Sequence, residues 1–188
     1  MKVKGLLVAA AAAMLCFGAQ KASAIEAPNH EGDFFLNIQG GLGGDHSTGL
    51  GASVSADYVL VNSWWKGHFT IGGFVGTNFD KEKHYEWTGV EWIERTWVNT
   101  SIMARATYGL NITNKFEVHA GAMAGASLRF WSEDPELTTR DNDGHNFDPN
   151  GAAVAGIRFF LSDNFALTSE LIGGLHMTYF NAGITLKF

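Results

Sequence analysis

Cysteine, proline and lysine are scarce in this chain. Its 188 residues include one cysteine, Cys16, and three prolines, and charged residues make up 17% against 46% hydrophobic. One cysteine excludes a disulfide framework within the chain, and the apolar content excludes a disordered polymer. No apolar run reaches the roughly 18 residues that a transmembrane helix needs. The net charge of −6 argues against a nucleic-acid partner.

The first 24 residues have the features of a secretory signal peptide. Two lysines precede an uncharged run of apolar and small residues from 6 to 19. Ala22-Ser23-Ala24 then supplies the small residues that a signal peptidase requires. We therefore expect residues 1–24 to be removed, Cys16 with them, and residues 25–188 to form one domain.

From Asp33 onward, apolar residues occupy every second position in eight successive segments. In one of them, Leu50, Ala52 and Val54 alternate with Ser53 and a second serine. Each segment is about 10–13 residues long, near the roughly 9–11 of a tilted membrane strand and longer than an ordinary globular strand. A period of two predicts strands rather than helices. The fold class predicted is therefore all-β, an eight-stranded antiparallel up-and-down transmembrane β-barrel.

The links between these segments alternate between long and short. Residues 80–96 and 132–150 form the longest links, whereas the intervening turns are brief. Outer-membrane barrels have long extracellular loops and short periplasmic turns, so we expect loops 80–96 and 132–150 to be extracellular and to meet any partner. The segment from Asp80 to Trp97 contains Trp92 and Trp97, which could extend a strand above the membrane, pack locally, or offer an aromatic edge to a partner or a sugar.

The alternation also fits a soluble barrel with an apolar pocket, such as a lipocalin. We favour lipid outside and polar groups inside, because the polar face has very little lysine and its charges are balanced. An unpaired enclosed charge costs on the order of 3–5 kcal/mol, so such charges must pair. Across the short turns, we expect Arg105 to lie opposite or diagonal to Glu117, and Arg158 to lie diagonal to Glu170. The predicted ion-pair network of the lumen consists of Asp57, Arg105, Glu117, His119, Arg129, Arg158 and Glu170.

The last ten residues form a strand that alternates up to a terminal aromatic. Its apolar positions are Phe180, Ala182, Ile184, Leu186 and Phe188. With this ending, residues 25–188 resemble the small outer-membrane β-barrels of Gram-negative bacteria, the OmpA-barrel and OmpX-like group. The resemblance implies a monomer in the bacterial outer membrane, in contact with lipid and lipopolysaccharide. It also implies that the barrel-assembly machinery reads the final strand as its signal.

Function is less constrained than fold. Eight strands enclose a space that side chains fill, which favours a plugged barrel with a structural role or a surface-interaction role through its extracellular loops. The alternatives are a narrow, porin-like channel and a lipid-modifying enzyme. His119 beside Glu117 is the one candidate base, but no serine stands at a matching spacing, so no catalytic residue is assigned. The other histidines show no metal-ligand spacing, and no metal or cofactor is expected.

Overall fold

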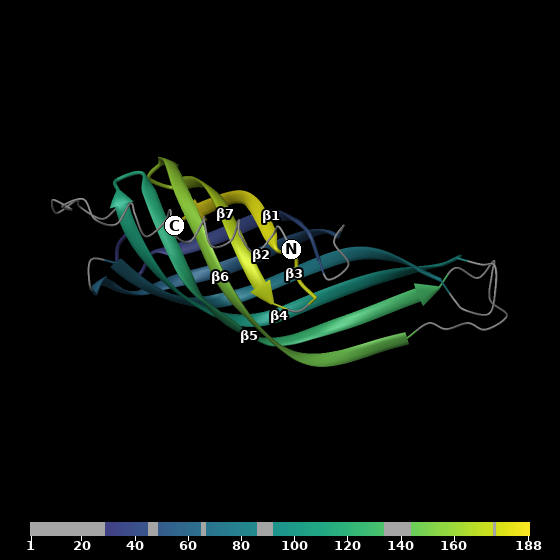
Figure 1. Ribbon diagram of the computed structural model, residues 1–188. Coiled ribbons are helices and arrows are strands. Elements are labelled where there is room, and N and C mark those ends of the chain that lie inside the picture. Colours follow the sequence, from purple (N-terminus) through teal and green to yellow (C-terminus); the bar gives the residue numbers. More distant parts are fainter. Residues whose placement is uncertain (1–28, 45–48, 65–66, 86–91, 134–143, 175) are drawn as a thin grey trace, which may run out of the picture.

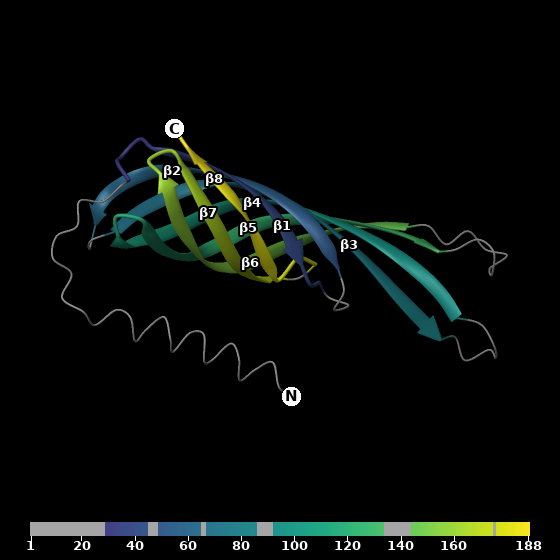
Figure 2. The ribbon, with the colours of Figure 1, turned by 90° about the horizontal axis from the view of Figure 1, so that it is seen from above.

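Eight antiparallel strands form one closed barrel in the computed structural model of the chain (Figures 1 and 2). The structure describes residues 29–44, 49–64, 67–85, 92–133, 144–174 and 176–188, so the expected signal peptide lies outside the described residues. The strands are β1 (Phe34–Leu42), β2 (Leu50–Trp64), β3 (Gly67–Tyr85), β4 (Trp92–Thr113), β5 (Phe116–Glu133), β6 (Gly144–Ser162), β7 (Phe165–Gly174) and β8 (Phe180–Lys187). No helix in the described part of the chain is long and apolar enough to cross a membrane.

Each strand pairs with its neighbours in sequence, and β8 closes the ring on β1. The closing pairs run from Phe35 opposite Lys187 to Leu42 opposite Phe180. Phe188 completes the seam, because its N–H donates to the Phe34 carbonyl and its carbonyl accepts from the Phe34 N–H. Closure leaves the barrel wall without a free edge. The predicted fold class is confirmed.

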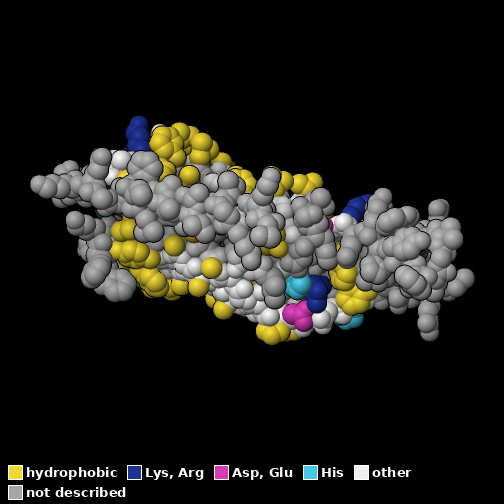
Figure 3. Space-filling view, viewed as in Figure 1, with side chains coloured by type: hydrophobic (Ala, Val, Ile, Leu, Met, Phe, Trp, Pro, Cys, Tyr) yellow, Lys and Arg dark blue, Asp and Glu magenta, His cyan; other side chains and the backbone are white. Residues whose placement is uncertain are grey.

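The alternation in the sequence places apolar side chains outside and polar ones inside. Ile102 is 56% exposed on the outer face, whereas Arg105 on the same strand is 2% exposed inside. In Figure 3 hydrophobic side chains are spread over the visible barrel wall, and the charged ones lie towards its ends. A soluble barrel with an apolar pocket has the opposite arrangement, so that alternative is wrong.

Four neighbouring strands, β3 to β6, are the longest of the eight, and β2 with 15 residues comes next. β3 to β6 have 19, 22, 18 and 19 residues, whereas β1, β7 and β8 have 9, 10 and 8. Figure 1 shows these four strands running well past the end of the barrel. We call their outer ends the projecting sheet, which comprises residues 76–85, 92–101, 127–133 and 144–151.

The prediction of loops was therefore wrong for residues 80–85, 92–96, 132–133 and 144–150, which lie in strands, and its remaining parts, 86–91 and 134–143, lie outside the described residues. The ladder of β3 and β4 continues to Tyr85 opposite Trp92, and that of β5 and β6 to Trp131 opposite Gly144. The alternation weakens there, because this part of the chain lies beyond the lipid belt. Hydrogen bonds between the hairpin strands continue the ladder nonetheless.

Candidate functional site

Two arginines hold three carboxylates together in the half of the lumen near the short turns. Arg105 donates from Nη2 and Nη1 to the Oε1 and Oε2 atoms of Glu170 at 2.6 and 3.0 Å. Its Nε lies 3.2 Å from Oδ1 of Asp57. Arg158 donates to Oε1 of Glu117 at 2.7 Å and reaches Oδ2 of Asp57 at 3.5 Å. All five side chains are shielded from solvent, so the pairs operate in a low dielectric.

Two histidines complete this network. The Nε2 atom of His119 lies 2.9 Å from Oε1 of Glu170, and its Nδ1 lies 3.6 Å from Oε1 of Glu117. His68 was not identified from the sequence, although its Nε2 lies 3.7 Å from the same Glu117 oxygen. The alternation of inward and outward residues could have identified His68, because it lies two residues before Thr70 and both side chains point into the lumen.

Polar and apolar side chains close the lumen below the network. The amide of Asn29 donates to Oε2 of Glu117 at 2.8 Å, which places the segment before β1 under the barrel. Phe35 lies beneath Arg158, with its ring centroid 4.6 Å from the guanidinium carbon. Phe35 belongs to a fully enclosed apolar cluster with Val59, Phe160 and Ala166.

The structure brings together six of the seven residues predicted for the network, and Arg129 is the one it places elsewhere. Arg129 donates from Nη2 to Oδ2 of Asp148 at 2.9 Å, and its side chain is 25% exposed. The prediction located Arg129 in the lumen because it treated β5 as a strand of ordinary membrane length. With 18 residues, β5 carries Arg129 into the projecting sheet instead.

The predicted position of Arg105 was wrong, whereas that of Arg158 is confirmed. Arg158 lies opposite Thr168 and is therefore diagonal to Glu170, although its hydrogen bond goes to Glu117. Arg105 lies opposite Met123, not Glu117, and Glu117 lies opposite Arg158. Arg105 instead reaches Glu170 of β7. The prediction considered only strands joined by a short turn, whereas long side chains span the narrow lumen of an eight-stranded barrel.

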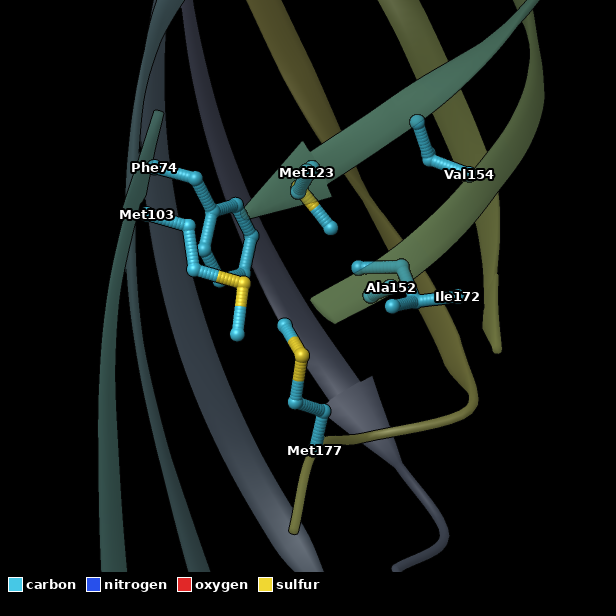
Figure 4. Packing of buried hydrophobic residues seen from close by; sticks show 7 residues of the cluster. All are labelled: Phe74, Met103, Met123, Ala152, Val154, Ile172 and Met177. Atoms are coloured by element: carbon cyan, nitrogen blue, oxygen red, sulfur yellow. The ribbon is translucent and has the colours of Figure 1, made fainter. Parts of the chain in front are cut away.

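A second, apolar layer fills the lumen above the ionic one. We call it the methionine plug; it comprises Phe74, Met103, Met123, Ala152, Val154, Ile172 and Met177. In Figure 4 three methionine side chains point toward one another beside the ring of Phe74. A hollow of about 10 Å³ lies next to the plug, lined in part by Phe74, Asn78, Ser101 and Met177. This volume has room for about one water molecule.

The methionine plug was not predicted. Met103 and Met123 occupy inward positions, on the same parity as Arg105 and His119 respectively. An apolar residue at such a position breaks the alternation, and Phe74 does so visibly in the sequence. Because unbranched methionine adapts to irregular gaps, it suits a lumen whose wall is a tilted sheet.

The residues of the predicted assembly signal lie on the last strand and face outward. Phe180 and Phe188 are 42% and 68% exposed, and the ring of Phe188 lies 6.4 Å from that of Phe34. Phe180 pairs with Leu171, and Leu186 pairs with Phe165, across the β7–β8 ladder. The apolar positions of this strand, Phe180, Ala182, Ile184, Leu186 and Phe188, therefore continue the belt of the barrel wall.

The projecting sheet carries different side chains on its two faces. Phe130 and Phe147 are exposed on its outer face, where a hollow of about 370 Å³ is lined in part by Val98, Phe130 and His145. Trp97 and Trp131 lie opposite each other on the inner face, with ring centroids 5.4 Å apart. The inner face overlies the barrel mouth, since its residues share the parity of the lumen residues.

Comparison with known proteins gives a match in structure and none in sequence. No family model matches the chain, and no curated protein is significantly similar to it. The crystal structure of Ail, the attachment invasion locus protein of Yersinia pestis, in complex with the heparin analogue sucrose octasulfate has a TM-score of 0.52 at 14% identity. That match covers 85% of this chain and 100% of Ail.

A second solved structure has a lower score. The N-terminal β-barrel domain of Pseudomonas aeruginosa OprF has a TM-score of 0.45 at 13% identity, covering 85% of this chain and 100% of that one. The match to Ail shows the fold. Together with the apolar outer face, it identifies the chain as a small β-barrel of the bacterial outer-membrane type.

Proposed function

We propose that this protein is a closed outer-membrane barrel that presents a rigid four-stranded sheet to the extracellular side as an interaction surface. The observation that carries the proposal is the length of β3 to β6, which continue their ladders past the barrel as far as Tyr85 opposite Trp92. A sheet that is hydrogen-bonded to this height is pre-organised, so binding orders few additional groups.

The filled lumen supports a surface role over conduction. The ionic network and the methionine plug occupy the interior at two successive levels, and the plug residues Phe74, Met103 and Met123 are at most 4% exposed. An ion that crossed this interior would displace packed apolar side chains and separate buried ion pairs. The narrow channel is therefore the weaker alternative.

An enzymatic role for His119 has less support than a surface-interaction role or a narrow channel. Both ring nitrogens face carboxylates, those of Glu170 and Glu117, rather than a nucleophilic hydroxyl. The imidazole also lies inside the barrel, away from the lipid that a lipid-modifying enzyme would bind. A structural role within the ion-pair network accounts for all its contacts.

The remaining parts of the proposal concern the surroundings of the barrel. Lipid and lipopolysaccharide contact the apolar wall, and the outward residues of β8 serve as the signal for the assembly machinery. Ail was crystallised with a heparin analogue, and a barrel of this fold that takes a ligand lends support to a binding role for this chain.

Two measurements test the proposal. Planar-bilayer recordings of the purified protein should show no stable conductance steps. In a second protein, tight turns replace residues 77–100 and 128–149, which removes the projecting sheet. Heat-modifiable gel migration verifies that its barrel still folds.

The decisive comparison uses bacteria that display either protein. Cells with the full-length protein should adhere to surfaces coated with matrix protein, heparin or neutral glycans, and cells with the shortened protein should not. Equal adhesion of the two, or a regular conductance, would refute the proposed function.

A further inference from the structure

The inner face of the projecting sheet combines two indole rings with a dense set of amide, hydroxyl and charged groups. The pairing register places these side chains in rows across β3, β4, β5 and β6. The outermost row is Asp80, Trp97, Trp131 and Gly144; the next is Asn78, Asn99, Arg129 and Asn146; the third is Gly76, Ser101, Ser127 and Asp148. Below them the methionine plug forms an apolar floor.

The two indoles form a half-exposed aromatic platform. Their planes are inclined by 46°. The ring of Trp131 extends over Gly144, where an added Cβ would clash with Cζ2 of the indole. Glycine at position 144 therefore makes room for the ring to lie against the sheet.

The polar side chains beside this platform are fixed in place. Ser101 and Ser127 share a hydrogen bond of 2.7 Å, and the amide of Asn150 donates to Ser127 at 2.8 Å. Asp148 accepts from both Arg129 and Asn146. Such a network holds donors and acceptors in a defined array without a mobile loop.

Two amides in the middle row have hydrogen-bonding capacity left over. Asn78 is 2% exposed, and neither Nδ2 nor Oδ1 makes a hydrogen bond within the described part of the chain. Asn99 is 5% exposed, and its Oδ1 also accepts no hydrogen bond within the described part of the chain. Asn78 lines the hollow beside the methionine plug, where a water molecule can bond to it. Asn99 does not line that hollow, and because an unsatisfied buried polar group costs about 1–3 kcal/mol, native structures seldom retain one without a reason.

From these observations we infer that the inner face of the projecting sheet binds an uncharged oligosaccharide from the extracellular medium. Indole faces pack against the C–H faces of pyranose rings, and planar amide, carboxylate and guanidinium groups match neighbouring hydroxyls. This inference rests on the proposed function, because it assigns a ligand class to the same sheet.

Charge and position select the ligand and its source. By formal charge, the described side chains of the inner face include two carboxylates, Asp80 and Asp148, and one guanidinium, Arg129. A polyanion would meet net negative charge here. The sugars of the cell's own lipopolysaccharide surround the outer face, where Phe130 and Phe147 are exposed, whereas the inner face overlies the barrel mouth. A soluble neutral glycan therefore fits the inner face better than a polyanion or the sugars of lipopolysaccharide.

The experiment uses the full mature protein refolded in detergent free of lipopolysaccharide. Binding to an array of neutral hexasaccharides of glucose, galactose, mannose and N-acetylglucosamine is measured, and hits are titrated by calorimetry. Sucrose octasulfate serves as the anionic probe. Trp131→Ala and Asn99→Ala should each weaken binding by about tenfold or more, equivalent to about 1.4 kcal/mol. Phe147→Ala on the outer face is the matched control and should leave affinity unchanged.

Each outcome decides the question. Trp131→Phe keeps a ring and should retain part of the affinity, which separates loss of stacking from loss of fold. Binding to none of the neutral sugars, binding to sucrose octasulfate alone, or binding that Trp131→Ala leaves intact would overturn the inference. If the hairpin-shortened barrel loses adhesion while the array stays blank, the sheet binds a partner of another class, and only this inference fails.

Discussion

Replacing Arg158 by methionine provides the strongest test of the enclosed ion-pair network. Arg158 is fully buried, donates to Glu117 at 2.7 Å and lies 3.5 Å from Asp57. Methionine keeps most of the side-chain volume and its packing on Phe35, so the substitution removes mainly charge. Two buried carboxylates then lose a cation. We expect a loss of about 3–5 kcal/mol in the free energy of unfolding, or about 10²- to 10⁴-fold in the equilibrium constant.

Reversible urea unfolding in lipid vesicles, followed by tryptophan fluorescence, measures this loss. Arg129→Met is the matched control, because the same substitution removes the same charge from a partly exposed pair, where about 0–1 kcal/mol is expected. Adding Glu117→Gln to Arg158→Met should restore part of the stability, since it removes one uncompensated carboxylate. A cost for Arg158→Met as small as that for Arg129→Met would refute the reasoning.

Three further predictions concern the wall, the plug and the free edge. Ile102→Arg on the lipid face should cost about 2–4 kcal/mol in vesicles, and similar stability of this variant and the wild type would contradict the assigned faces. Met103→Ala should cost about 2–5 kcal/mol by opening a cavity in the plug; unfolding that is unchanged would show that the plug is loosely packed. Pro149→Val should promote association of copies through the edge of β6, visible by crosslinking, whereas a strictly monomeric variant would show that proline does not protect this edge.

The barrel itself was predictable because a closed sheet between lipid and a narrow lumen requires strict alternation. Ile102 and Arg105 lie three residues apart on one strand, and their opposite parity alone assigned one to lipid and the other to the interior. The same parity identified six charged and imidazole side chains that meet in the lumen. Their pairing did not follow, because it depends on which side chains reach across the barrel, and this is set by the stagger of all eight strands.

The projecting sheet was less predictable because the sequence signal changes where the surroundings change. Beyond Phe79 the outer face no longer needs to be continuously apolar, and the segment 80–96 therefore has the composition of a loop. The pairing of Lys81 with Thr96 and of Asp80 with Trp97 depends on the neighbouring strand. Amino-acid composition reports whether a segment faces lipid or water. The length of a strand here depends on whether the neighbouring strand continues to pair with it.

The same alternation of inward and outward residues thus produces three successive layers of inward side chains along β3 to β6. The inward positions carry buried ion pairs near the short turns, then the methionine plug, and then amides, hydroxyls and indoles in the projecting sheet. The edges of that sheet obey the same geometry. The N–H of Phe160 donates to the Lys115 carbonyl, so even-numbered residues of β6 bond to β5 and odd-numbered residues face the other way. Above Ala152, the last partner of β7, Pro149 lies at an edge that pairs with no other strand of the described residues. A residue without an N–H there removes one donor that another strand would need.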